Sequence, residues 1–390
     1  MTLKTRLSIL LLSTPVVVFV VVGGLIGRAS ATGGDETFQH LRVFDDVLKL
    51  VLSNYVEEVK VDRAMEGALK GLAEGLDPDS AYLNAQQVAE VQSGTPLPDG
   101  DVGLELTRQY YLRVIAARDR SPAAKAGLRT GDYIRAINDM PTREMSVWEG
   151  VHALRGTPGS KVSITIIRGN AADPHVIELT RENEPASVVT GKMAGAGVGY
   201  VRVAAVGPAT ANQVAAQVAE LTKGGASKLI VDVRRLSSGT IDQGIALARL
   251  FVGQGTLAIR EQKGGVREPI TAASGDGAVS LPLVVLIDTG TSAASEIFAA
   301  AVAGNKRGDL VGEHTIGRAA AQKLVKLPDG AGLWLSTMRY LTPSGAQLHE
   351  KGLEPTVPVD EPDVEFGQPA PTADPILDKA IERLTEKKAA

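Results

Sequence analysis

The chain has 390 residues, a formal net charge of -4 and no cysteine, and 44% of its residues are hydrophobic. This length leaves room for two or three domains, and the apolar content is sufficient for their cores. The absence of cysteine excludes disulfides, thiol catalysis and thiolate metal sites. The charge gives no indication of nucleic-acid binding, and the five histidines form no pair with metal-ligand spacing, so we expect no nucleic-acid partner and no metal or other cofactor.

Residues 1–31 have the features of an export segment. Lys4 and Arg6 precede an uncharged apolar stretch over 7–27, and Ala29-Ser30-Ala31 has the small-x-small form of a signal-peptidase site. The stretch also approaches the roughly 20 residues of a membrane-spanning helix. An uncleaved inner-membrane anchor and a cleaved signal peptide both remain open. Either one places the rest of the chain outside the cytoplasm, in the cell envelope or periplasm.

A helical region is predicted over residues 36–90. Apolar residues recur at helical spacing from Phe44 to Tyr55. A second helix is expected from about Asp62 to Leu76, because Asp77-Pro78 ends it. The pattern indicates a helical hairpin that packs on the rest of the chain or forms a dimer.

Short strands separated by turn residues follow over 95–185. Ser121 to Leu128 predicts a capped short helix that ends at a glycine, and Tyr133–Ile137 and Val162–Ile166 read as strands. These segments closely resemble a PDZ domain. Such domains add the C-terminal segment of a peptide to a sheet edge and hold its carboxylate with backbone N–H groups. The resemblance implies that the carboxylate loop consists of Val102, Gly103, Leu104, Glu105 and Leu106. A PDZ domain that packs internally and binds nothing is the alternative.

Residues 190–360 alternate between strands and helices. Strands are predicted over Val198–Val203 and Lys228–Arg234, and helices over Ala209–Leu221 and Gln243–Val252. This repeating order implies a largely parallel sheet with helical cover. Residues 361–390 begin as a Pro-rich acidic linker and end in a predicted helix.

The stretch from Leu281 to Gln322 is the candidate site. Leu283–Ile287 predicts a buried strand, and the turn Gly290–Glu296 leads into a helix of small residues over Ile297–Ala303. A tight turn at a helix N-terminus aims backbone N–H groups at one point, where enzymes place nucleophiles and oxyanions.

This stretch resembles the active site of the C-terminal processing (tail-specific) peptidases, S41-type serine proteases with a PDZ domain and a Ser–Lys dyad. Their motif Gly-Ser-Ala-Ser-Ala-Ser-Glu aligns with Gly290–Glu296 and puts the nucleophile position on Ala293. Their motif Gly-Glu-x-Thr-Phe-Gly-Lys-Gly-x-x-Gln aligns with residues 312–322. It puts the general-base position on Arg318 and the glutamine on Gln322.

The resemblance extends over most of the chain. The family's Asp-Pro-His-Ser segment is Asp77-Pro78-Asp79-Ser80 here, so Asp79 replaces a histidine. The resemblance implies an N-terminal helical region, a PDZ-like β-rich domain and an α/β core. That core is of the ClpP/crotonase-like kind, with a mixed, largely parallel sheet.

Both reactive groups of the family are missing. A methyl group cannot attack a carbonyl, and a guanidinium with a pKa above about 12 cannot accept a proton. The family's oxyanion turn, Asn-Asn-Pro-Gly-Gly, is replaced by residues 235–239, which end in Ser237-Ser238-Gly239. By resemblance, the N–H groups of Gly239 and Ala294 hold the two oxyanion positions. Three departures in separate elements favour natural loss over an engineered Ser→Ala change.

Ser292 is an alternative nucleophile, with His314, Glu296 or Lys323 as its base. Nucleophile and base must lie within about 3 Å of each other. Serines at a helix start are more often N-caps, and Glu296 then reads as a capping partner. Arg318 likewise has two interpretations, a solvated or salt-bridged strand residue and a carboxylate-binding residue.

The sequence therefore predicts a non-catalytic member of the family in the cell envelope. It would bind the C-termini of proteins or peptides, a partner protease or a second copy of itself. The alternative is an active serine-type endopeptidase that processes envelope proteins through Ser292. A purely structural role through the N-terminal helices is a third possibility.

Overall fold

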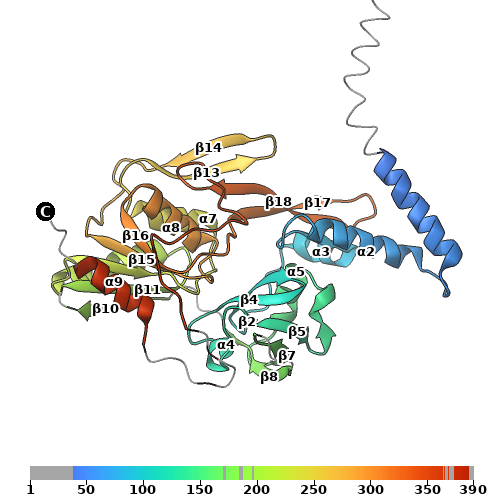
Figure 1. Ribbon diagram of the computed structural model, residues 1–390, viewed down its shortest axis with the longest axis horizontal. Coiled ribbons are helices and arrows are strands. Elements are labelled where there is room, and N and C mark those ends of the chain that lie inside the picture. Colours follow the sequence, from blue (N-terminus) through green and yellow to red (C-terminus); the bar gives the residue numbers. More distant parts are fainter. Residues whose placement is uncertain are drawn as a thin grey trace, which may run out of the picture. The chain divides into compact units, whose positions relative to one another are not determined.

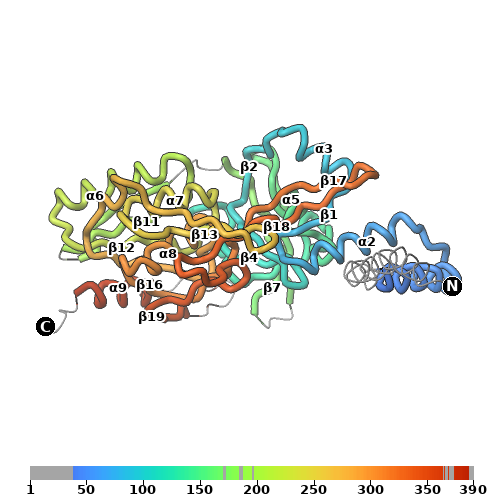
Figure 2. The backbone as a smooth tube through the Cα atoms, turned by 90° about the horizontal axis from the view of Figure 1, so that it is seen from above, coloured from blue at the N-terminus to red at the C-terminus, as the bar shows by residue number. Residues whose placement is uncertain are grey.

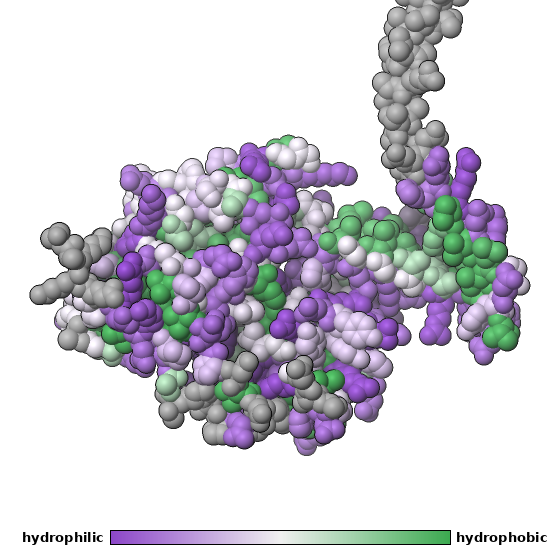
Figure 3. Space-filling view, viewed as in Figure 1, coloured by the Kyte–Doolittle hydropathy of each residue, from purple (hydrophilic) through white to green (hydrophobic). Residues whose placement is uncertain are grey.

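The computed structural model describes residues 38–169, 173–183, 188–195, 197–362, 364, 368 and 373–385. The chain divides into two compact units, Met1–Ala68 and Leu69–Ala390. The described part of the first unit contains a helix over 38–54 and the start of α2 (Val61–Glu74). The apolar side chains of the first helix are exposed within this chain, and Figure 3 shows them gathered on its surface; they include Phe38, Leu41, Phe44, Val47 and Val51.

The predicted export segment, residues 1–31 with the apolar stretch 7–27, lies outside the described residues. Within the part of the chain that the structure describes, no helix combines the length and the hydrophobicity needed to cross a bilayer.

The PDZ domain of the second unit is built around an antiparallel sheet in the order β3-β4-β5-β7-β8 (Figure 1). Its strands are β3 (Leu104–Gln109), β4 (Tyr111–Ala117), β5 (Tyr133–Ile137), β6 (Met140–Pro141), β7 (Lys161–Ile167) and β8 (His175–Thr180), with β2 (Gly100–Asp101) and β9 (Glu182–Asn183) as a separate pair. Its helices are α4 (Pro122–Lys125), η1 (Thr142–Glu144) and α5 (Val147–Leu154). Ser121 caps α4 as predicted, because its side chain accepts from the Ala124 N–H. Strand β3 lies at the edge of this sheet.

The α/β core has a six-stranded sheet, β10-β11-β12-β15-β16-β19, in which only the β10–β11 pair is antiparallel. The strands are β10 (Val188–Gly195), β11 (Val198–Ala205), β12 (Lys228–Asp232), β15 (Leu283–Ile287), β16 (Gly308–Gly312) and β19 (Val357–Pro358). Helices α6 (Thr210–Lys223), α7 (Ile241–Arg249) and α8 (Ala294–Gly304) pack on one face, and α9 (Pro375–Thr385) packs on the other (Figure 2). Alternate residues of the strands therefore serve two separate cores, as expected for a sheet covered on both faces. The predicted fold class, α/β with a PDZ domain, is confirmed.

A second sheet was not predicted. It has the order β1-β18-β13-β14, and β17 pairs with β18. Its strands are β1 (Ala81–Leu83), β13 (Thr256–Gln262), β14 (Val266–Thr271), β17 (Ala320–Lys326) and β18 (Gly332–Leu341), and α3 (Ala85–Ser93) follows β1. Both Ala81 of β1 and Leu324 of β17 pair with Trp334. Strand β18 therefore brings the turn over 77–80 close to the segment that carries Arg318.

Candidate functional site

The turn between β15 and α8 has the strained geometry of a nucleophile turn. Ala293 has φ 53° and ψ -118°, in the left-handed half of backbone space that residues with a side chain avoid. Two hydrogen bonds hold the turn against the segment that follows β12. The Thr291 hydroxyl donates to the Val233 carbonyl at 3.0 Å, and the Ser292 N–H donates to the Leu236 carbonyl at 3.1 Å. Strain of this kind persists only where the surroundings fix it, so the chain keeps the turn although its tip carries a methyl group.

The oxyanion turn lies against this turn. The Ser237 and Ser292 hydroxyl oxygens are 2.5 Å apart, and both are buried. Gly239 has φ 93°, and a Cβ there would lie 2.5 Å from Val206 Cγ1, so only glycine fits. Neither the Gly239 N–H nor the Ala294 N–H donates a hydrogen bond to another described residue. The two candidate oxyanion donors are therefore on adjacent turns and unused within the described chain.

Ser292 is not placed beside a base. Its hydroxyl is fully buried and meets Ser237. His314 is half-exposed and its Nε2 lies 3.6 Å from Glu354, while Lys323 is exposed on β17. Of the three candidate bases, Glu296 is buried, but its carboxylate is hydrogen-bonded to the segment over 315–318.

The predicted capping roles of Ser292 and Glu296 are wrong. The N-cap residue of α8 is Ala293, and no side chain caps the helix. The Ser292 N–H instead donates to Ser295 Oγ at 3.1 Å. The Ser292 hydroxyl meets the Ser237 hydroxyl and caps no backbone N–H of α8.

Glu296 fixes the segment that carries Arg318. Its fully buried carboxylate accepts from the Thr315 hydroxyl and, at 2.9 Å each, from the backbone N–H groups of Gly317 and Arg318. Burial raises the pKa of Glu296 to about 7, although the three hydrogen bonds favour the charged form. This role could not be predicted from the sequence, because the three donors are 19 to 22 residues away from Glu296.

Arg318 is a salt-bridged residue just before β17. Its Nη2 donates to Asp79 Oδ1 at 2.6 Å, its Nε to Asp79 Oδ2 at 3.3 Å, and its Nη1 to the Leu106 carbonyl at 3.2 Å. Burial opposes the charge, but the adjacent Asp79 outweighs it and the pKa of Arg318 is raised. Arg318 therefore joins the α/β core to the turn at 77–80 and to the PDZ domain.

Gln322 connects to the same turn. It donates to Ser336 Oγ at 3.1 Å, and the Ser336 N–H donates to Ser80 Oγ at 3.2 Å. Arg318 and Gln322 thus converge on Asp79 and Ser80. Glu296, in the first turn of the helix that follows Ala293, accepts from the Arg318 N–H.

The candidate carboxylate loop of the PDZ domain is largely buried. The Gly103 carbonyl accepts from the Arg118 N–H at 2.8 Å, and the Val102 carbonyl accepts from Ala123 at 3.0 Å. Gly103 has φ 78°, and a Cβ there would overlap the Ser121 side chain. Leu106, at the end of the loop, contacts Arg318 through its carbonyl.

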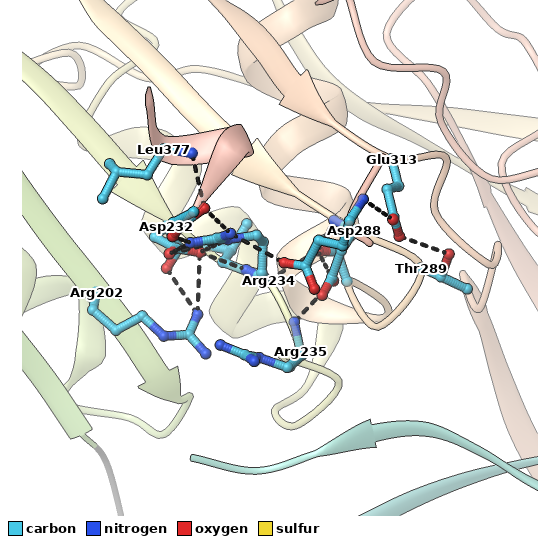
Figure 4. Close-up of polar contacts among 12 residues, drawn as sticks. Arg202, Asp232, Arg234, Arg235, Asp288, Thr289, Glu313 and Leu377 are labelled. Carbon is cyan, nitrogen blue, oxygen red and sulfur yellow. Dashed lines mark hydrogen bonds and ion pairs between the residues drawn. The ribbon is translucent and has the colours of Figure 1, made fainter. Parts of the chain in front are cut away.

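A buried charge network lies at the end of β12, just before the oxyanion turn (Figure 4). Asp232 is 1% exposed and accepts from Arg234, from Arg202 at 3.3 Å and from Tyr200 at 2.7 Å. Burial opposes ionisation, yet the two guanidinium groups hold the pKa of Asp232 well below its usual range. Arg234 also pairs with Asp374 at the start of α9. The network therefore ties the oxyanion turn to the C-terminal helix.

Residues 197–359 match the model of peptidase family S41, and residues 113–168 match a PDZ domain model. The chain is 32% identical over 363 residues to the carboxyl-terminal-processing protease of Synechocystis sp., an alignment that covers 90% of this chain and 83% of that protein. The chain belongs to the carboxyl-terminal-processing proteases of peptidase family S41. The carboxy-terminal processing protease CtpA of Bacillus subtilis is 29% identical and is covered to 72%. The solved structure of a photosystem II D1 C-terminal processing protease matches with a TM-score of 0.68 and 29% identity, over 80% of this chain and 86% of that one.

The chain therefore has the fold of this family and departs from the family motifs at its candidate site. Ala293 holds the strained turn of the nucleophile position, and Arg318 follows the segment fixed by Glu296. Asp79, in place of the motif histidine, is the partner of Arg318. These two departures from the family motifs are in direct contact.

Proposed function

We propose that this chain is a non-catalytic carboxyl-terminal-processing protease homologue that binds polypeptides without cleaving them. The observation that carries the proposal is the Asp79–Arg318 ion pair. A residue in the general-base position must lose a proton to act. Arg318 is instead a permanently charged guanidinium, and a carboxylate at 2.6 Å holds it in that form.

The nucleophile position supports the same conclusion. Ala293 offers no oxygen or sulfur to a substrate carbonyl. The Gly239 and Ala294 N–H groups can still donate hydrogen bonds to a substrate carbonyl oxygen, because they have no partner among the described residues. Such a site holds a peptide group and performs no chemistry on it.

The proposed ligands are the C-terminal segments of proteins or peptides. PDZ domains bind such segments by adding them to a sheet edge, and β3 is an edge strand here. A partner protease or a second copy of the chain would present a C-terminus in the same way. Lys4, Arg6 and the apolar stretch 7–27 support a location outside the cytoplasm, anchored to the inner membrane.

The alternative function, an endopeptidase that uses Ser292, has less support. Its side chain is 0% exposed and its hydroxyl contacts another hydroxyl, and within the described part of the chain no imidazole or amine is hydrogen-bonded to it. An acylating serine probe tests it directly. Labelling of the purified chain that disappears in Ser292→Ala would overturn the non-catalytic proposal.

Hydrolysis and binding are tested separately. Unfolded casein incubated with the chain should remain intact. A fluorescein-labelled peptide of about 10 residues ending in Leu-Ala-Ala should bind with a free carboxylate and bind more weakly as the amide. Equal affinity for the two forms, or no binding of either, would contradict the proposed recognition of C-termini.

A further inference from the structure

The contact between Arg318 and Leu106 occupies the edge at which a PDZ ligand would add. Leu106 lies directly opposite Val114 in the β3–β4 pair. The Val114 N–H donates to the Asp132 carbonyl, and the Val114 carbonyl accepts from Gly131, so both polar groups of Val114 point away from β3. In an antiparallel pair, the residue opposite then also points its N–H and C=O outward. The Leu106 carbonyl therefore belongs to the open edge of the sheet.

Arg318 takes the place of an added strand at this edge. Its Nη1 donates to the Leu106 carbonyl at 3.2 Å, which is the hydrogen bond that a backbone N–H of a bound peptide would make. The two other nitrogens of the guanidinium are held by Asp79, whose side chain is only 8% exposed. The Arg318 backbone is fixed by Glu296, so the side chain has little freedom to leave while the PDZ domain stays in contact with the core.

The open edge continues into a cavity. Arg108, two residues beyond Leu106, presents its backbone to the same side, because Leu112 opposite it also directs its N–H elsewhere, to Thr142 Oγ1. Arg108 and Tyr110 line a cavity of about 490 Å³ together with Asp77, Pro78 and Ser80 of the turn next to Asp79. An extended chain that follows β3 past Leu106 would therefore enter space that is already present.

We infer that Arg318 is a built-in competitor of the peptide ligand: a polypeptide adds to β3 at Leu106 only when the Arg318–Leu106 contact opens, and Asp79 stabilises the closed arrangement. This inference deepens the proposed function and rests on it. The ligand is an extended polypeptide segment with a free C-terminus, which runs along Leu106 and Arg108 into the cavity.

The two tryptophans of the chain report on this contact. Trp148 of the PDZ helix α5 packs against the same cluster as Trp334 of β18 and Leu324 of β17. Separation of the PDZ domain from the core would expose this cluster to water. Binding of the ligand should therefore shift the tryptophan emission of the native chain to longer wavelength.

Peptide affinity of the full chain and its variants tests the inference. The double variant Asp79→Ala/Arg318→Ala removes both charges together, so it leaves no unpaired buried ion. Arg318→Lys keeps a positive charge opposite Asp79 but lacks the planar guanidinium, which donates to Asp79 and Leu106 at the same time. The labelled peptide ending in Leu-Ala-Ala is the probe, and its amide is the control.

The double variant should bind the free-carboxylate peptide at least about fivefold more tightly than the native chain, because no closed state remains to compete. It should also show the red-shifted emission before peptide is added. Arg318→Lys should lie between the two. Equal affinity in all three chains, with no change in emission, would overturn the inference and leave the proposed function standing. Absence of binding in every chain would overturn both.

Discussion

Asp79 and Arg318 are 239 residues apart in the chain, and their side chains meet at 2.6 Å. In the family motifs these two positions are a histidine and a lysine, so the replacement of both produces a matched ion pair. A carboxylate beside a lysine raises the pKa of the lysine and keeps it protonated. The proposed loss of catalysis would therefore have two parts. The serine and lysine of the motifs are absent, and Asp79 would hold a lysine at position 318 in its protonated form.

The first prediction concerns restoration of hydrolysis. Ala293→Ser alone should leave casein intact, because the guanidinium of Arg318 cannot accept a proton. Ala293→Ser with Arg318→Lys should also leave casein intact, because Asp79 holds the new lysine in its charged form. Adding Asp79→His to the double variant should give measurable cleavage and labelling by an acylating serine probe. Equal cleavage by the double and triple variants, including none in either, would show that Asp79 does not suppress the dyad.

The second prediction concerns the strained turn. Ala293→Gly should stabilise the chain by about 1 kcal/mol, because glycine adopts a positive φ at no steric cost and the present strain is of order 1–3 kcal/mol. Ala299→Gly is the matched control in the middle of the same helix, where Ala299 is fully buried. It should destabilise by about 1 kcal/mol or more. Urea unfolding of both variants measures the difference, and a loss of stability in Ala293→Gly would contradict the strain.

Much of the fold could be predicted from the sequence because its strands and helices carry strong local patterns. Leu283–Ile287 is an uninterrupted apolar run, and the structure has β15 at the same bounds. The Ser121 cap and strand Tyr133–Ile137 were likewise fixed by local signals. The second sheet was missed because no residue of β17 is buried and β14 carries no alternation of burial, so neither has a pattern that a single sequence reveals.

The candidate site could likewise be predicted only in part. The motifs predicted a tight turn that leads into a helix at Gly290–Glu296, and the structure has such a turn, with a positive φ at Ala293. They did not reveal that Glu296 binds the segment before β17, nor that Arg318 reaches Asp79 and Leu106. These contacts join the segment before β17 to helix α8, to the turn over 77–80 and to the PDZ domain. These parts are far apart in the sequence and meet only in the folded chain. Asp79 itself was a visible departure from the motif, and its charge opposite to Arg318 was the one available signal.

The third prediction concerns pH. The pKa of Glu296 is raised from 4.5 to about 7 in the folded chain, so between these values the folded state binds more protons than the unfolded state. The free energy of unfolding should therefore fall as pH rises from about 5 to about 7.5, by on the order of 3 kcal/mol from this group. Burial raises the pKa of Asp288 to about 6, which acts in the same direction.

Glu296→Gln separates this contribution from those of other groups. The variant cannot ionise at this position, so its unfolding free energy should depend less on pH over the same range, with a residual slope due to Asp288 and to His152, whose pKa burial lowers. Urea unfolding at several pH values measures both chains. Parallel pH profiles for the native chain and the variant would show that Glu296 does not titrate in this range.

The fourth prediction concerns the buried charge network. Arg234→Met should cost roughly 3–5 kcal/mol, because it removes the principal partner of Asp232, which is 1% exposed and cannot be solvated in place. Asp374→Asn should cost only about 1 kcal/mol, because that carboxylate is 38% exposed, but it should loosen α9. Lys379→Gln on the same helix is the control, since both partners of its pair with Glu382 are exposed, and its effect should stay below about 0.5 kcal/mol. Unfolding in urea gives the three free energies, and limited proteolysis at the end of α9 detects its release. If Asp374→Asn and Lys379→Gln were digested at the same rate, the Arg234–Asp374 pair would not be what holds the C-terminal helix to the sheet.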